Sequence, residues 1–90
     1  MEDYFNLNCK RNINHIMKRR GLTAVDIFNS LSLHSPIFGY LERTIRRVVS
    51  TNTDRQIRLV EIVEIARILK VSSGDLAFIP HEEFIQKYKG

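Results

Sequence analysis

The side chains that could do chemistry in this chain are its cations, three histidines, one cysteine and a pair of adjacent glutamates. The histidines are too scattered along the sequence to form a metal site, and a lone Cys9 can form no internal disulfide. Glu82 and Glu83 have no neighbouring nucleophile or matched base, and no glycine-rich loop is present to hold a phosphate. The sequence therefore predicts neither an enzyme nor a bound cofactor, and Cys9 is expected in the core.

The cations are concentrated in the first two thirds of the chain. The 90 residues carry a formal net charge of +4, but residues 10–58 alone hold ten Lys or Arg against three acidic residues. The segments on either side are acidic overall. This asymmetry indicates one surface for a polyanion and another for a different contact, and the alternative is an ordinary solvated basic face.

Length and composition are those of a single folded domain spanning residues 1–90. Hydrophobic residues make up 43% of the chain and no low-complexity tract interrupts it. The longest apolar stretch, from Leu59 to Leu69, contains two glutamates and an arginine, so no transmembrane helix is expected. The acidic N-terminus lacks the features of an export signal, and the protein is expected to be cytoplasmic.

Helical spacing of apolar residues runs through nearly the whole chain. A first amphipathic helix is expected over residues 5–20, ended by Gly21, and Thr23 with Asp26 predicts the start of a second helix through residue 31. Ser35 and Pro36 predict the start of a third helix, running to about residue 49. A fourth is expected over residues 54–70, a fifth over 72–78 and a last turn or two after residue 80. The predicted fold class is all-α, with five to six helices.

Two blocks of this sequence resemble the Cro/CI-type (XRE family, lambda-repressor-like) helix-turn-helix domain. The first block runs through Gly21-Leu22-Thr23 and Leu31-Ser32-Leu33 to Leu41-Glu42-Arg43, and the second is residues 65–76, Ile-Ala-Arg-Ile-Leu-Lys-Val-Ser-Ser-Gly-Asp-Leu. The resemblance covers residues from about 10 to 78 and implies a helix-turn-helix motif at about 22–43. It also implies a function: a phage- or mobile-element-like repressor that binds double-stranded DNA as a homodimer.

The resemblance assigns residues to the DNA contact. Those expected along the start of the second helix and the recognition helix are Thr23, His34, Ser35, Ile37, Gly39, Tyr40 and Arg43, followed by Arg46 and Arg47 along the backbone. Further phosphate contacts are expected from Lys18, Arg19, Arg20, Arg55 and Arg58. Polar side chains among these can donate to bases or phosphates, whereas Ile37 could contact a thymine methyl.

A second hypothesis follows from Pro36 and Gly39, which suit a recognition helix poorly. The motif could instead bind a partner repressor protein, as an antirepressor or repressor modulator. Phe38 is expected to face inward; exposure of Ile37 and Tyr40 beside Val25 would favour this protein-binding hypothesis.

The C-terminal segment, residues 76–90, is the predicted dimer contact of a DNA-binding homodimer. The apolar residues expected there are Leu76, Phe78, Ile79, Phe84, Ile85 and Tyr88. The alternative is that these side chains complete the core of the monomer.

Overall fold

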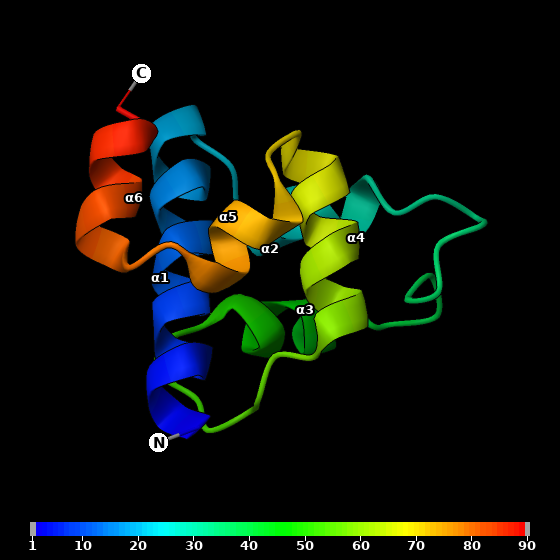
Figure 1. The fold of residues 1–90 in the computed structure, drawn as a ribbon. Helices are drawn as coiled ribbons and strands as arrows, with labels where there is room; N and C mark the ends of the chain where they lie inside the picture. Colours follow the sequence, from blue (N-terminus) through cyan, green and yellow to red (C-terminus); the bar gives the residue numbers. More distant parts are fainter. Residues whose placement is uncertain (1, 90) are drawn as a thin grey trace.

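The computed structural model describes residues 2–89, and of residues 2 and 3 the backbone alone. Six α-helices and no strand form in this part of the chain, so the all-α prediction is confirmed. The helices are α1 (Glu2–Arg20), α2 (Ala24–Asn29), α3 (Glu42–Val49), α4 (Leu59–Leu69), α5 (Ser73–Phe78) and α6 (His81–Lys87). The long α1 packs against α3, α5 and α6, and α4 lies beyond α5 (Figure 1). No helix in residues 2–89 is long and apolar enough to span a bilayer.

Helix α1 holds the centre of the core with one face. Cys9, Ile13, Ile16 and Met17 recur at steps of three and four and are all buried, as the sequence predicted. Gly21 ends the helix with φ 67°, the left-handed conformation that glycine accepts at low cost. The rest of the core comes from every other helix and from two connections: Ala24, Ile27, Ile37, Ile45, Val48, Val49, Ile57, Ile62, Ile65, Ala66, Leu69, Leu76, Ala77 and Phe84.

The expected third helix over residues 35–49 is wrong in its first half. Residues 30–41 are non-helical, and α3 begins at Glu42. This connection is a series of tight turns in which the amides of Phe38 and Tyr40 donate to the carbonyls of Ser35 and Ile37, at 3.0 Å each. Burial of Ile37 and the glycine at position 39 favour these turns over a continuous helix.

The fourth helix also starts later than predicted, at Leu59 instead of residue 54. The carboxylate of Glu61 accepts a hydrogen bond from the Arg58 amide at 2.8 Å and thereby caps the helix. The segment before it is attached to α1: Lys10, fully buried, donates from Nζ to the Arg55 carbonyl at 2.5 Å, and the Asn6 amide oxygen accepts from the Ile57 amide at 2.8 Å. These two long-range bonds attach residues 55–57 to α1 and leave them outside the helix, which begins at Leu59.

The C-terminal segment contributes to the core of the monomer, which was the alternative to its expected role as a dimer contact. Leu76 and Phe84 are fully buried, and Ile79, Ile85 and Tyr88 are half-buried. Two asparagines of α1 fasten the segment: Asn8 donates to the Ile79 carbonyl at 2.9 Å, and Asn12 donates to the carbonyls of residues 76 and 79. Of the predicted dimer contacts, Phe78 is the one exposed to solvent, at 75%.

Candidate nucleic-acid interface

Helix α3 has one apolar face and one cationic face. Ile45, Val48 and Val49 are buried against α1 and α2, whereas the three arginines of the helix are exposed. Arg43, Arg46 and Arg47 are spaced by three and four residues and therefore form one ridge on the outer side. The helix thus presents three guanidinium groups to solvent from a backbone fixed by its buried side.

The central arginine of this ridge has an internal partner. Arg46 forms an ion pair with Glu42, one turn earlier on the same helix, and the two side chains are 60% and 41% exposed. An exposed pair of this kind is weak, so a phosphate could compete for the guanidinium. Arg43 and Arg47 form no ion pair with the side chains described here, residues 4–89.

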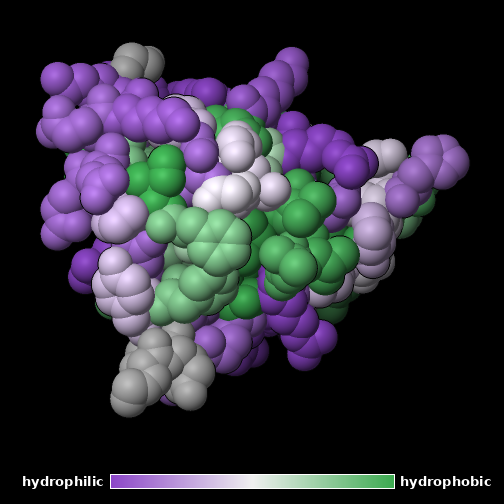
Figure 2. Space-filling view, viewed as in Figure 1, coloured by the Kyte–Doolittle hydropathy of each residue, from purple (hydrophilic) through white to green (hydrophobic). Residues whose placement is uncertain are grey.

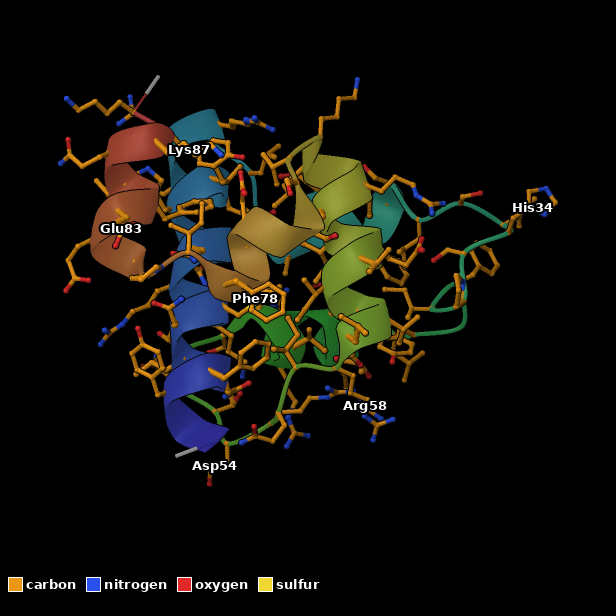
Figure 3. All side chains as sticks on the ribbon, viewed as in Figure 1. His34, Asp54, Arg58, Phe78, Glu83 and Lys87 are labelled. Atoms are coloured by element: carbon orange, nitrogen blue, oxygen red, sulfur yellow. The ribbon has the colours of Figure 1, made fainter. Side chains whose placement is uncertain are left out.

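The residues expected on a recognition helix lie instead on the connection between α2 and α3. His34 and Gly39 are exposed, and Figure 3 shows His34 at the outer tip of this connection, away from the helices. Ser35 and Ile37 are buried, so neither can touch a base in this conformation. Phe38, expected to face inward, is 45% exposed. The structure therefore does not assemble the predicted reading surface.

Thr23 is occupied by helix capping. Its amide and hydroxyl donate to one carboxylate oxygen of Asp26, at 2.7 and 3.1 Å. The capping interaction is the one that the sequence predicted. It places a negative charge beside Thr23, which is unfavourable for a phosphate at this position.

Tyr40 is used within the molecule. Its hydroxyl donates to the buried carboxylate of Glu61 at 2.6 Å, and Arg55 donates to both oxygens of the same carboxylate at 2.9 and 3.1 Å. Burial raises the pKa of Glu61, but the hydrogen bonds from Tyr40, the Arg58 amide and Arg55 outweigh it and hold the pKa below its usual value. Arg55, a predicted phosphate contact, therefore belongs to this internal cluster, which the sequence did not reveal.

The other predicted phosphate contacts lie on two separate parts of the surface. Lys18 and Arg19 are exposed in the last turn of α1, where Arg20 donates to the Leu69 carbonyl at the end of α4. Arg58 is exposed at the start of α4, below that helix in Figure 3. The three cations at the end of α1 stabilise the negative end of the helix dipole whether or not they bind a ligand.

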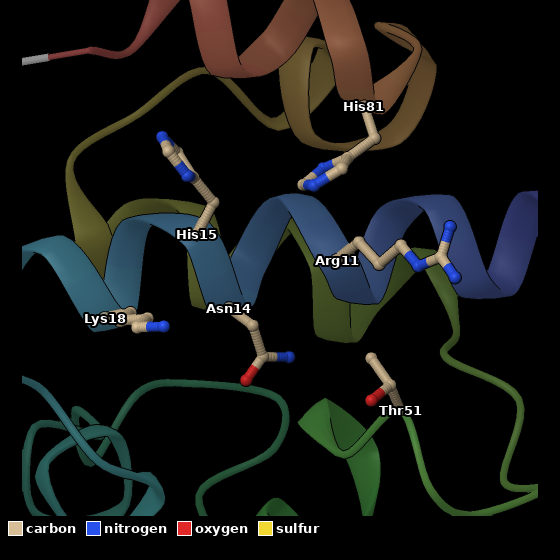
Figure 4. A pocket seen from close by; sticks show the side chains of 6 residues that line it. All are labelled: Arg11, Asn14, His15, Lys18, Thr51 and His81. Atoms are coloured by element: carbon tan, nitrogen blue, oxygen red, sulfur yellow. The ribbon is translucent and has the colours of Figure 1, made fainter.

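A shallow groove runs along the outer face of α1, with a volume of about 510 Å³. It is lined by Arg11, Asn14, His15 and Lys18 of α1, by Thr51 after α3 and by His81 at the start of α6 (Figure 4). None of these residues is acidic. Apart from Lys18, these residues were not among the predicted contacts, although Arg11, Asn14, His15 and Lys18 share the spacing of one helix face and could have been grouped from the sequence.

Apolar side chains gather on another face, formed by α1, α5 and α4 (Figure 2). Phe5 of α1 and Phe78 of α5 lie with ring centroids 6.2 Å apart, and α4 adds Leu59, Val60 and Val63, which are all exposed. We call these five residues the Phe78 patch. A cluster of this size on the surface of a small domain is typical of a protein contact.

Comparison of the chain with family models, curated proteins and solved structures gave no match.

Proposed function

We propose that this chain is a DNA-binding transcription regulator that contacts double-stranded DNA through the arginine ridge of α3. The observation that carries the proposal is the exposure of Arg43, Arg46 and Arg47 on one side of a helix whose other side is buried. Arginine suits both roles required at such a surface, because its planar fork binds phosphate and can read the edge of guanine.

The size of α3 fits a DNA groove. An α-helix with its side chains is about 10–12 Å across, close to the ~12 Å width of the major groove, and the eight residues of α3 make a helix about 12 Å long that could lie within it. Arg58, at the start of the following helix, is exposed, and we expect it to add a contact to the DNA backbone. In this arrangement α3 takes the place of the predicted recognition helix, and regulation is by occupation of a promoter in the cytoplasm.

A homodimer is part of the proposal, with the Phe78 patch in place of residues 79–88 as the contact. Phe78 and Leu59 are 75% and 69% exposed. With aromatic side chains offering about 200 Å² each, the patch exposes roughly 400 Å² of apolar surface. This is enough for the centre of an interface of roughly 800 Å² per partner, whose rim would be polar.

The DNA proposal is tested by titrating labelled duplexes from the region upstream of the coding sequence at two salt concentrations. The variant Arg43→Gln/Arg47→Gln is expected to bind at least tenfold more weakly, with a salt slope reduced by about two. The control is Lys70→Gln/Lys89→Gln, which removes the same charge from two exposed lysines after α4 and α6. Equal loss in both variants would indicate a response to net charge and would contradict a role for α3.

The second candidate is a modulator that binds a partner repressor protein, and the Phe78 patch is the observation that favours it. Absence of DNA binding, together with association to a candidate repressor that Phe78→Ser abolishes, would support this candidate against the first.

A further inference from the structure

The groove on α1 contains side chains that the DNA proposal does not use. Arg11 and Lys18 lie two helical turns apart on the same face and flank it at its two ends (Figure 4). Neither cation forms a hydrogen bond or ion pair with the side chains that the structure describes. Two cations free of internal partners at the ends of one groove are arranged for an anionic ligand.

The two histidines of the groove are held in defined orientations by backbone and amide groups. His15 Nε2 lies 2.9 Å from the Tyr88 carbonyl oxygen, so this nitrogen carries the hydrogen and donates. His81 Nδ1 lies 2.9 Å from Oδ1 of Asn12, whose own amide nitrogen donates to two carbonyls. His81 Nδ1 is therefore the donor as well, which leaves its Nε2 for the groove.

The groove is electropositive at His81. Burial, followed by the charges of Arg11 and His15, holds the pKa of His81 below its ordinary value, and Glu82 on α6 opposes them. When His81 is neutral, its Nε2 presents a lone pair to an incoming anion; when it is protonated, the same atom becomes a donor. An anion between Arg11 and Lys18 would offset the repulsion that disfavours this protonation.

We propose that this groove binds a phosphate group, held by Arg11 and Lys18 with the Thr51 hydroxyl as a further donor, and binds it more tightly when His81 is protonated. The same phosphate chemistry is offered by a nucleic-acid backbone and by a small phosphorylated molecule. A backbone phosphate would extend the DNA contact from α3 to α1, because Thr51 lies two residues beyond the end of α3. A small molecule would make the groove an effector site.

The first experiment titrates inorganic phosphate into the intact protein and follows amide and imidazole NMR signals. Sulfate is titrated in parallel, because phosphate changes its own charge near neutral pH and sulfate does not. The expected shifts map to residues 11–18, 51 and 81. Arg11→Gln/Lys18→Gln is expected to weaken binding at least tenfold, while the control Lys70→Gln/Lys89→Gln, which removes the same charge from two exposed lysines, is expected to leave binding within about twofold.

The second readout is pH dependence, with sulfate as the probe. Binding is expected to be tighter at about pH 5.5 than at about pH 7.5, because the protonated His81 adds a positive charge and a hydrogen-bond donor to the groove. His81→Asn keeps a donor for Asn12 but cannot be protonated, so most of this increase is expected to disappear. The native spectrum of each variant establishes that it is folded.

The source of the phosphate is decided by two further titrations of Arg11→Gln/Lys18→Gln. Weaker binding to duplex DNA with a smaller salt slope identifies the backbone. Unchanged binding to DNA, together with loss of binding to a nucleoside monophosphate, identifies a small phosphorylated molecule as the ligand. Absence of sulfate and phosphate binding at either pH, or shifts confined to α3, would overturn the inference; neither result bears on the arginine ridge, whose variants are separate.

Discussion

The hydroxyl of Tyr40 lies 2.6 Å from Oε2 of Glu61, across 21 residues of sequence. Glu61 is fully buried and also accepts from Arg55 and from the Arg58 amide. A buried carboxylate requires such partners, because its ionised form is strongly disfavoured without them. This cluster therefore ties the connection before α3, the connection after it and the start of α4 into one unit.

Removing the hydroxyl tests the energetic contribution of this cluster. Tyr40→Phe deletes one donor to a buried charge and is expected to lower the free energy of unfolding by about 1–3 kcal/mol. Urea unfolding of the wild type and the variant measures this change in free energy. Tyr4→Phe is the matched control, since Tyr4 is 66% exposed, and is expected to change stability by less than about 0.5 kcal/mol. Similar effects of the two substitutions would contradict the structural role of Tyr40.

The Glu61 cluster also predicts how stability depends on pH. The pKa of Glu61 is lower in the folded chain than its ordinary value, so the folded state binds fewer protons there than the unfolded state. Its contribution is complete above the unfolded pKa, about 4.3, and is lost as pH falls through the lower folded pKa. Unfolding free energies measured across this range should fall less steeply with acidification in Glu61→Gln, which is less stable at neutral pH.

Glu42 competes with DNA for Arg46 on α3, so removing its charge is expected to strengthen DNA binding, whereas removing an arginine is expected to weaken it. Glu42→Gln frees Arg46 and removes a carboxylate beside the ridge, so duplex DNA should bind about three- to tenfold more tightly, with the salt slope raised by about one. Glu83→Gln removes the same charge from an exposed residue of α6 and is the control. If both variants gain equally, net charge explains the effect and the ridge does not.

Two phenylalanines at the C-terminal end separate core from surface. Phe84→Ala is expected to lower the free energy of unfolding by about 3–5 kcal/mol, since Phe84 is fully buried and stacks on Tyr88 with ring centroids 4.5 Å apart.

Phe78→Ser is expected to leave thermal unfolding nearly unchanged while weakening self-association, because the Phe78 ring is exposed. Sedimentation at several protein concentrations measures this association. A Phe78→Ser chain that associates as strongly as the wild type would show that the Phe78 patch is not the dimer contact.

Cys9 reports on opening of the core. It is fully buried, and burial raises the pKa of its thiol to about 12, although the charge of Lys10 acts in the opposite direction. Thiolate is the reactive form, so Cys9 should react with a thiol reagent in the native protein far more slowly than a free cysteine does. Labelling should rise with urea along the unfolding curve. Rapid labelling without urea would show that α1 opens locally.

The sequence predicted the parts of this structure that rest on interactions within a few residues. Gly21 ends α1, the Thr23–Asp26 capping pair starts α2, and Ser72 caps α5 through the Asp75 amide at 3.2 Å. The buried face of α1 followed from its spacing. Each of these features is encoded by adjacent turns, so the residue types alone identify it.

The tertiary structure alone decided where α3 and α4 begin and which cations are free. Ser35 and Pro36 are residue types that favour a helix start. However, Ile37 is buried in the core and Tyr40 donates a hydrogen bond to Glu61, and these contacts are made by a chain of turns in place of a helix. Arg55 and Arg47 look alike in the sequence, yet one is paired with a buried carboxylate and the other is exposed. A buried carboxylate must be paired with donors that the fold places near it. Residues far apart in the sequence can supply these donors, so local spacing does not identify them.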